Sequence, residues 1–273
     1  MKNCICIVLW HNNQSLFEEL INNSNLDIFV ISHKSIDDIP HWLNTYVNSE
    51  HIFIEPNIGY DWGAYQQFLE KKIYLNYSSI FFSHDDLLIK DNLIFNYCLD
   101  IIEANNGYCI VGNGLNNKKR DWPLTHIHCY AHSKWKPPSW NFCHDTMRGS
   151  FFGTSSNALK IIDNFEVYWD HHKFLGVGAG NWSLRATCGK IQEILGENSF
   201  QFLSQNYRDT PFLIEMERGK LNNSLNDKHQ PVNIRYLLIY RISKFLMTWY
   251  MDTNNKNIKN YLSIIMSFIF NKL

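Results

Sequence analysis

The chain has 273 residues and a formal net charge of −1, with 19% charged and 15% aromatic residues. This length suits one large domain or a domain with an appendage, and the low charge together with many aromatic side chains excludes a disordered chain or a coiled coil. The near-neutral charge also argues against a protein that binds nucleic acid electrostatically.

Apolar runs alternate with amphipathic stretches in the first 112 residues. Continuous apolar runs are typical of parallel strands that are covered on both faces, and spacings of three and four residues are typical of helices. Strand and helix in alternation predict an α/β fold, with a mostly parallel Rossmann-type sheet and helices on both faces. The expected strands are 4–10, 26–32, 52–54, 79–83 and 108–111, and the expected helices are 15–21, 63–75 and 91–103.

The pattern changes in the second half of the chain. Residues 112–145 show no sustained periodicity, and we interpret them as an insertion or a substrate-facing loop region. Regular structure returns with a strand predicted at 148–153 and a helix predicted at 158–165, for which Ser155 or Ser156 is a suitable N-cap.

Residues 233–273 form a basic tail, which contains six Lys and Arg residues and a single acidic residue, Asp252. The tail carries a net charge of +5, which leaves −6 for the rest of the chain. Apolar spacing predicts amphipathic helices at 233–251 and 257–270, a C-terminal helical appendage. A basic amphipathic helix with aromatic side chains can lie in a membrane interface, dock on the core of its own domain, or form a dimer.

Two adjacent carboxylates, Asp85 and Asp86, follow the strand predicted at 79–83. Ligands of an open parallel sheet bind beyond the carboxyl ends of its strands. Like charges repel, so this pair is poorly placed for stability, but it suits a hard cation such as Mg²⁺ or Mn²⁺ that also binds phosphates. The alternative is that one Asp caps the following helix, a role for which Asp91 is better placed.

The sequence NIGYDWG at 57–63 follows the third predicted strand. Gly59 permits a sharp turn, and Gly63 allows a close approach of backbone or ligand. Because a predicted helix begins here, its first amides can face an anionic group. The residues at and just after the ends of the first two strands, among them Trp10, His11 and Ser32, converge on the same edge of the sheet.

The order of these segments resembles that of GT-A-fold, family-2-like glycosyltransferases of the bacterial surface-glycan type. The segments are LWHNN at 9–13, FIEPNIGYDWGAY at 53–65, SSIFFSHDDLLIKDNLI at 78–94 and RGSFFGTSSNALKIID at 148–163, and the resemblance covers about residues 4–195.

The resemblance implies a GT-A-like domain over residues 1–232, followed by the basic helices at 233–273. Within that domain, 1–112 would be the nucleotide-binding half and 113–232 the acceptor half. It also implies a metal site at Asp85 and Asp86. The residues implied to bind the nucleotide sugar are Trp10, His11, Ser32, Asn57, Gly59, Asp61 and Asp85.

The sequence departs from the family pattern at two places. The base-contacting Asp of many members is missing at 31–34, which reads ISHK. The acidic pair that supplies the catalytic base is replaced by Gly180 and Asn181, and neither accepts a proton at neutral pH. Another group must then act as the base in an inverting enzyme. The candidates are Asp170, Asp145 and His171, and an imidazole at 171–172 is also a usable metal ligand.

The resulting expectation is a metal-dependent, inverting glycosyltransferase that uses Mn²⁺ or Mg²⁺. It would move a sugar from a nucleotide-sugar donor to a hydroxyl of a glycan or lipid-linked acceptor in surface polysaccharide synthesis. The alternative, motivated by the missing acidic pair, is a non-catalytic relative that binds a sugar nucleotide or a glycan. No nucleic acid partner is expected.

The expected location is the cytoplasm. The N-terminus has no leader pattern, no apolar run reaches roughly 18 residues, and the seven cysteines lack framework spacing. An enzyme that builds on a lipid carrier would need to reach a bilayer, so we expect the basic helices to dock on the inner face of the membrane.

Overall fold

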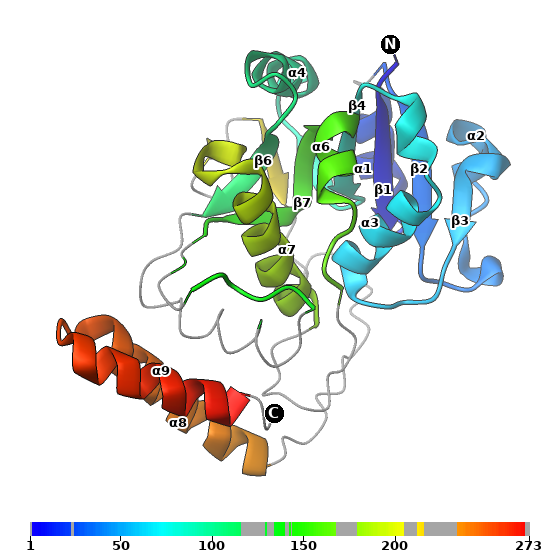
Figure 1. Ribbon diagram of the computed structural model, residues 1–273. Coiled ribbons are helices and arrows are strands. Elements are labelled where there is room, and N and C mark those ends of the chain that lie inside the picture. The colour runs from blue at the N-terminus through cyan, green and yellow to red at the C-terminus, as the bar shows by residue number, and fades with distance from the viewer. Residues whose placement is uncertain are drawn as a thin grey trace.

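The computed structural model describes residues 2–22, 25–115, 129, 134–139, 142, 144–167, 179–204, 212–215 and 234–270. Seven strands form one mixed sheet in the order β3-β2-β1-β4-β7-β6-β8 (Figure 1). The strands are β1 (Cys4–Leu9), β2 (Asp27–Ser32), β3 (Ile52–Ile54), β4 (Ser79–His84), β6 (Ile110–Leu115), β7 (Thr146–Ser155) and β8 (Phe200–Ser204). A two-stranded sheet pairs β5 (Leu87–Ile89) with β9 (Leu213–Glu215).

The sheet is mostly parallel. Strands β3, β2, β1 and β4 run in the same direction, and β6 is parallel to β8. Only β7 is reversed, since it pairs antiparallel with both β4 and β6. The predicted α/β class with a mostly parallel sheet is therefore confirmed. Because β7 is reversed, it begins at the edge where β4 and β6 end.

Helices cover both faces of the sheet, as predicted. One face packs against α3 (Tyr60–Glu70), α6 (Ser156–Ile162) and α7 (Ala179–Leu195). The other packs against α1 (Gln14–Asn22), α2 (Leu43–Tyr46) and α4 (Ile94–Ala104). The appendage is a hairpin of α8 (Ile234–Asp252) and α9 (Lys256–Phe270), which lies at one end of the molecule (Figure 1). Short 3₁₀ helices occupy Ile36–Asp38, Ser49–His51, Ile73–Asn76 and Glu197–Ser199.

Strand β1 shows why the first predicted strand is apolar throughout. Its side chains alternate between the two cores, and every one of them is at most 6% exposed. A strand buried on both faces has no position for a polar side chain. Cys4, Cys6 and Val8 belong to the core beneath α3, and Ile5, Ile7 and Leu9 belong to the core beneath α1.

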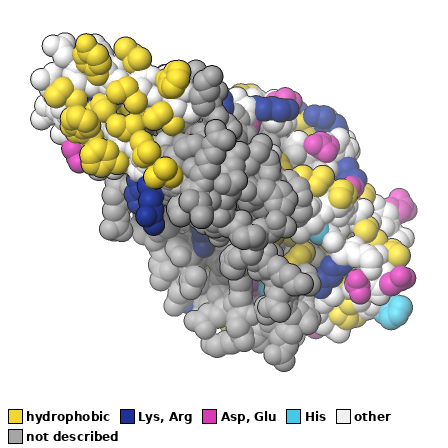
Figure 2. Space-filling view, turned by 90° about the horizontal axis from the view of Figure 1, so that it is seen from below, with side chains coloured by type: hydrophobic (Ala, Val, Ile, Leu, Met, Phe, Trp, Pro, Cys, Tyr) yellow, Lys and Arg dark blue, Asp and Glu magenta, His cyan; other side chains and the backbone are white. Residues whose placement is uncertain are grey.

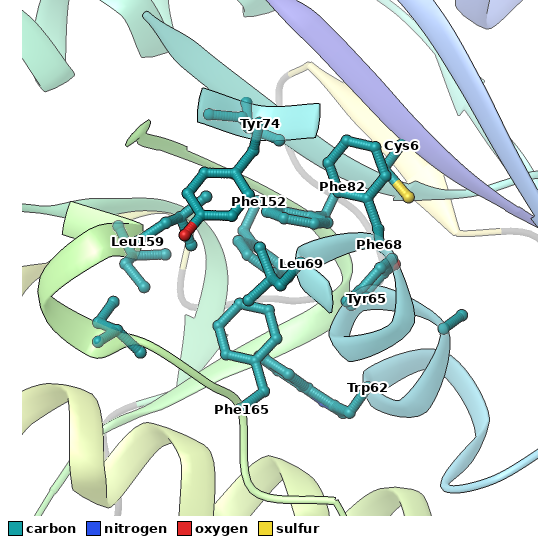
Figure 3. Packing of buried hydrophobic residues seen from close by; sticks show 14 of the residues in the cluster. Cys6, Trp62, Tyr65, Phe68, Leu69, Tyr74, Phe82, Phe152, Leu159 and Phe165 are labelled. Carbon is teal, nitrogen blue, oxygen red and sulfur yellow. The ribbon is translucent and has the colours of Figure 1, made fainter. Parts of the chain in front are cut away.

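An aromatic cluster fixes helix α3 against the sheet (Figure 3). The Tyr65 ring lies 4.9 Å from that of Phe82 on β4, and the Trp62 ring stacks on Phe152 of β7 at 5.3 Å. The rings of Phe82 and Phe152 are in turn 4.8 Å apart. Large buried aromatic side chains of this kind dominate the packing free energy of a core. The first turns of α3 are thereby held at the carboxyl edge of β4.

The predicted helix boundaries differ from the observed ones where turns intervene. The helix expected at 63–75 is α3, which begins at Tyr60 and ends at Glu70 because Lys72 adopts a φ of 59°. The helix expected at 91–103 begins at Ile94, because the Asp91 carboxylate accepts the Leu93 N–H at 2.9 Å and forms a turn.

The strand and helix predicted after residue 145 are both present. The strand at 148–153 is β7, longer at both ends and antiparallel, and the helix at 158–165 is α6. Of the two proposed N-caps, Ser155 is the one used, since its Oγ accepts the Ala158 N–H at 3.0 Å. Residues 112–115, expected to be irregular, continue β6.

Both helices predicted for the tail are present as α8 and α9. In the described part of the chain, neither of them nor any other helix is long and apolar enough to cross a membrane.

We predict that Gly63→Ala lowers the free energy of unfolding by about 3 kcal/mol. A Cβ at this position would lie 1.5 Å from the Ile58 carbonyl oxygen, so the first turn of α3 cannot keep its path. Urea denaturation measures the change. The control is Glu70→Ala, on an exposed position of the same helix, which should change stability by less than about 0.5 kcal/mol. Equal denaturation midpoints for Gly63→Ala and the control would contradict the close approach.

Candidate active site

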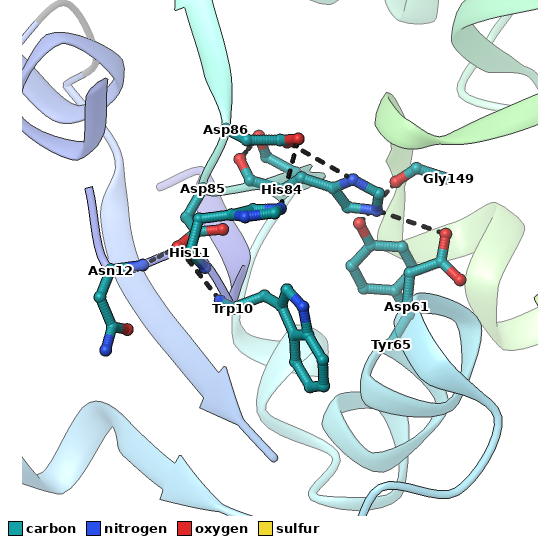
Figure 4. A network of polar contacts seen from close by, with 10 residues as sticks. Trp10, His11, Asn12, Asp61, Tyr65, His84, Asp85, Asp86 and Gly149 are labelled. Atoms are coloured by element: carbon teal, nitrogen blue, oxygen red, sulfur yellow. Dashed lines mark hydrogen bonds and ion pairs between the residues drawn. The ribbon is translucent and has the colours of Figure 1, made fainter. Parts of the chain in front are cut away.

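The carboxyl ends of β1 and β4 meet at one edge of the sheet, because the two strands pair in parallel. The loop that leaves β1 begins at Trp10, and Asp85 and Asp86 form the turn between β4 and β5. The first turn of α3 and the start of β7 lie together on the side opposite the β1 loop (Figure 4). This is the place where ligands bind in open α/β sheets.

Asp85 holds the loop that follows β1. The residue is 1% exposed, and its Oδ2 accepts three backbone N–H groups, from Trp10 at 3.1 Å, His11 at 2.8 Å and Asn12 at 2.9 Å (Figure 4). Burial raises the pKa of the Asp85 carboxyl, and the three backbone hydrogen bonds oppose that rise. Its second oxygen, Oδ1, is also buried and has no hydrogen-bond partner within the described part of the chain.

A chain of alternating carboxylates and imidazoles runs beside Asp85. Asp86, which is 3% exposed, has its Oδ2 3.5 Å from His11 Nε2 and its Oδ1 3.7 Å from His84 Nδ1. The other ring nitrogen of His84, Nε2, lies 3.3 Å from Asp61 Oδ2. We call His11, Asp61, His84 and Asp86 the carboxylate–imidazole cluster. Ionisable groups concentrated at a strand edge mark a candidate functional site.

Strand β7 supplies the wall next to Asp61. A Cβ on Gly149 would lie 2.2 Å from Asp61 Oδ2 and 3.1 Å from Trp62 Nε1, so glycine is what lets the helix approach the strand here. The buried Tyr65 hydroxyl donates to the Gly149 carbonyl at 2.6 Å, which fastens α3 to β7 beside the cluster.

The proposed nucleotide side lies around β2, β3 and the start of α3. Gly59 is the N-cap of α3, and with its φ of 85° it takes a left-handed conformation that suits glycine. Asn57 Oδ1 is buried without a hydrogen-bond partner within the described part of the chain. Ser32 is fully buried, and its Oγ accepts the Lys34 N–H at 3.2 Å, so this hydroxyl shapes the strand-end turn.

His33 links that turn to α3. Its Nε2 lies 3.0 Å from Gln67 Oε1, and Gln67 Nε2 donates to the Pro56 carbonyl at 2.8 Å. Because the amide nitrogen of Gln67 is used as a donor, its oxygen accepts, and His33 carries its proton on Nε2. Burial lowers the pKa of His33 below its usual value, against smaller opposing effects from Gln67, Glu55 and Asp61.

The structure brings most of the predicted site residues to one edge. Trp10, His11, Asp61, Asp85 and Asp86 lie together (Figure 4). Ser32, Asn57 and Gly59 lie at the adjoining ends of β2 and β3.

The predicted catalytic bases are only partly described. Asp145 directly precedes β7 at the same edge, where its N–H donates to Gln192 Oε1 at 2.7 Å and its carbonyl faces His144 Nδ1 at 2.9 Å. Asp170 and His171 lie outside the described residues. Gly180 and Asn181, at the positions where the sequence resemblance would place an acidic pair, lie in the first turn of α7.

His84 was not among the predicted site residues, although it stands at the centre of the cluster. The signal was its position as the last residue of a buried strand, directly before the two carboxylates. Asn12 was also missed. Its φ of 56° is a conformation that asparagine tolerates better than most residues, and its N–H is one of the three that bind Asp85.

A divalent cation fits the donor set at this edge. Asp85 Oδ1 is a buried oxygen without a hydrogen-bond partner in the described chain, and the next residue, Asp86, carries a second buried carboxylate. Among the described residues, no three His, Cys, Asp or Glu side chains come together as a metal-binding group. An ion here would thus take its remaining ligands from water or from a bound phosphate, as Mg²⁺ commonly does.

Comparison with known proteins gives matches among solved structures. No family model matches the sequence, and no curated protein matches it. The structure of TarS 1–349 from S. aureus with UDP-GlcNAc has a TM-score of 0.48 and 11% identity, covering 99% of this chain and 72% of that one.

Two further matches are similar in extent. The mannosyltransferase PcManGT from Pyrobaculum calidifontis, with GDP-Man and Mn²⁺, has a TM-score of 0.42 and 11% identity and covers 98% of this chain and 72% of that one. Glucosyl-3-phosphoglycerate synthase from Mycobacterium tuberculosis, with Mn²⁺ and UDP-glucose, has a TM-score of 0.45 and 14% identity, with 88% and 78% covered.

We predict that Asp85→Ala destabilises the protein by about 2–4 kcal/mol, because three backbone N–H groups lose their acceptor. Asp85→Asn keeps a carbonyl oxygen at this position and should cost about 1 kcal/mol. Urea denaturation of both variants measures the difference, with Asp37→Ala at an exposed carboxylate as the control. Equal stabilities for the Ala and Asn variants would show that the three bonds do not hold the loop.

We predict that His33 makes stability depend on pH. Its folded pKa lies below its unfolded value of about 6.5, so the unfolded state binds more protons between the two values. The contribution of the neutral imidazole is present above pH 6.5 and is lost as the pH falls toward the folded pKa. Thermal unfolding of His33→Gln should therefore change less with pH in this window than that of the unmodified protein. His41→Gln, at an exposed imidazole, is the matched control, and parallel pH curves for His33→Gln and the unmodified protein would refute the prediction.

Proposed function

We propose that the protein is a metal-dependent glycosyltransferase that moves a sugar from a nucleotide-sugar donor to a hydroxyl of a glycan or lipid-linked acceptor. The observation that carries this proposal is the carboxylate pair at the ends of β1 and β4. One oxygen of Asp85 shapes the β1 loop, while the other is buried beside Asp86 without a hydrogen-bond partner in the described chain. The setting that we propose, surface polysaccharide synthesis in a bacterium, rests on the sequence resemblance.

The donor would bind across the carboxyl edge of the sheet, with its nucleotide over β2 and β3. Asn57 Oδ1 is a buried hydrogen-bond acceptor that could bind an N–H or O–H group of the nucleotide. Asp85 and Asp86 would hold Mn²⁺ or Mg²⁺, which supplies positive charge to neutralise the departing diphosphate. Asp61 and Asp86 hold the imidazole of His84 between them, so that ring is fixed at the place where the diphosphate would lie.

The acceptor side needs a group that takes the proton of the attacking hydroxyl. Asp145 supports this role by position, since it precedes the reversed strand β7 at the same edge as the carboxylate pair. Asp170 and His171 remain candidates on sequence grounds. With such a base, direct attack of the acceptor hydroxyl on the donor sugar inverts the anomeric centre. We therefore propose that the enzyme is inverting.

We predict that a matching nucleotide diphosphate sugar raises the melting temperature and that Mn²⁺ increases the shift. A ligand at 100 times its Kd stabilises the folded state by about 2.7 kcal/mol, which is several degrees for a protein of this size. A thermal-shift screen of nucleotide sugars with and without Mn²⁺ measures this. Asp86→Asn should lose the metal-dependent part, whereas Asp91→Asn, at a turn carboxylate a few residues further along, should keep it. A screen without any metal-dependent shift would refute the metal site.

Turnover separates the enzyme from the non-catalytic alternative. Hydrolysis of the donor, or transfer of its sugar, should vanish in Asp86→Asn. It should also vanish in whichever of Asp145→Asn and Asp170→Asn removes the catalytic base. Donor binding without turnover on any acceptor would favour the alternative, a sugar-nucleotide or glycan-binding protein. Activity that persists in both base variants would exclude Asp145 and Asp170 as the base and leave the metal site unaffected.

A further inference from the structure

Helices α8 and α9 form a hairpin in which the two helices pack against each other. The two helices pack side by side (Figure 1), and each buries one face. Lys259 Nζ of α9 lies 5.4 Å from the centre of the Tyr250 ring of α8, a cation–π contact between the helices. Among the hairpin side chains that the structure describes, those at most 8% exposed are Ser243, Met247 and Tyr250 on α8 and Leu262 and Met266 on α9.

A second set of apolar side chains on the same hairpin is exposed. Figure 2 shows these side chains gathered over the hairpin, with basic side chains beside them. Single exposed apolar residues are ordinary, but a contiguous group of this size marks an interaction surface. The hairpin face consists of Leu238, Ile242, Phe245, Trp249, Tyr261, Ile264, Ile265 and Phe268, which are 43–72% exposed.

Phe245 and Trp249 form the aromatic part of the hairpin face on α8. Their ring centres are 6.3 Å apart, and with Thr248 and Asp252 they line an open groove of about 310 Å³. Phe245 is 67% exposed and Trp249 is 48% exposed. Tryptophan and tyrosine, which join an apolar ring to a polar N–H or O–H, are enriched at the boundary between lipid and water.

The same two helices also carry exposed basic side chains. Arg241 is exposed and stands one turn from Leu238 and Phe245, and Lys244 and Lys256 are exposed as well. Residues 233–273 together carry +5, whereas residues 1–232 carry −6. Each Lys or Arg close to an anionic bilayer adds an attraction of about 1 kcal/mol.

We propose that the hairpin face docks on the surface of an anionic lipid bilayer. A surface that joins exposed aromatic and aliphatic side chains to Lys and Arg matches the acyl boundary and the headgroup charge of such a bilayer together. A symmetric contact with a second copy of this chain would place the basic side chains of both copies, Arg241 and Lys244 among them, in one interface, where like charges repel. No residue of the carboxylate–imidazole cluster belongs to the hairpin, so the inference does not rest on the transfer reaction.

Co-sedimentation of the full-length chain with lipid vesicles tests the proposal. The probes are vesicles of phosphatidylcholine alone and of phosphatidylcholine mixed with phosphatidylglycerol. We expect binding to the anionic vesicles to be at least about tenfold stronger, and to weaken as salt screens the headgroup charge. Equal binding to both compositions, or none to either, would overturn the proposal.

Two pairs of variants assign the binding to the hairpin face. Phe245→Ser with Trp249→Ser should reduce vesicle binding at least about tenfold. Its control, Ile36→Ser with Leu93→Ser, removes two side chains that are 69% and 61% exposed elsewhere, and it should bind like the unmodified protein. Arg241→Glu with Lys244→Glu should abolish the preference for anionic vesicles. Its control, Lys72→Glu with Lys160→Glu, makes the same change of charge outside the hairpin and should keep the preference.

Circular dichroism and light scattering complete the test. All four variants change exposed positions, so their helix content and melting temperatures should match those of the unmodified protein. If the hairpin variants bind vesicles as well as their controls do, the hairpin face is not the membrane contact. A dimer that dissociates in Phe245→Ser with Trp249→Ser, in a protein that does not bind vesicles, would instead assign the hairpin face to a second copy.

Discussion

The carboxylate of Asp85 ties together two parts of the chain that are more than 70 residues apart. Its Oδ2 gathers three consecutive N–H groups of the β1 loop, including that of Asn12, which adopts a positive φ. Three donors that point at one oxygen fix the direction of the loop as well as its distance from β4. The side chain of His11 leaves from this loop, so its contact with Asp86 follows from the position that Asp85 sets.

Two adjacent carboxylates at 1% and 3% exposure are costly, because burial disfavours their charged forms. The surrounding structure offsets that cost in two ways. Backbone N–H groups and imidazoles face the carboxylates. The aromatic packing of Tyr65 and Trp62 against β4 and β7 also keeps α3 in place next to them. Because neighbouring backbone and side chains hold the two carboxylates in place, these groups are already oriented before a ligand arrives. Little reorganisation of the site is then needed on binding.

The sequence predicts the strands and helices of residues 4–112 well because the signals there are local. Apolar runs identify the parallel strands, and polar residues after strand ends identify the edge at which Asp85, Asp86 and Asp61 meet. The direction of β7 could not be predicted, since an apolar run looks the same in a parallel and an antiparallel strand. Nor does any local pattern reveal that one oxygen of Asp85 is used by backbone N–H groups near residue 11. That contact depends on the pairing of β1 with β4, which only the folded sheet establishes.

The separation of charge along the chain has a consequence beyond attraction. An anionic surface attracts the tail, which carries +5, and repels residues 1–232, which carry −6. The two effects together would orient the protein at the membrane as well as raise its concentration there. The repulsion acts over about a Debye length, which is close to 8 Å at physiological salt, and therefore acts most on the parts of the body nearest to the bilayer. A hairpin held flat in the interface would then leave the body standing away from the headgroups. For an enzyme whose acceptor is lipid-linked, that orientation brings the acceptor to the protein along the membrane plane while the donor arrives from solution.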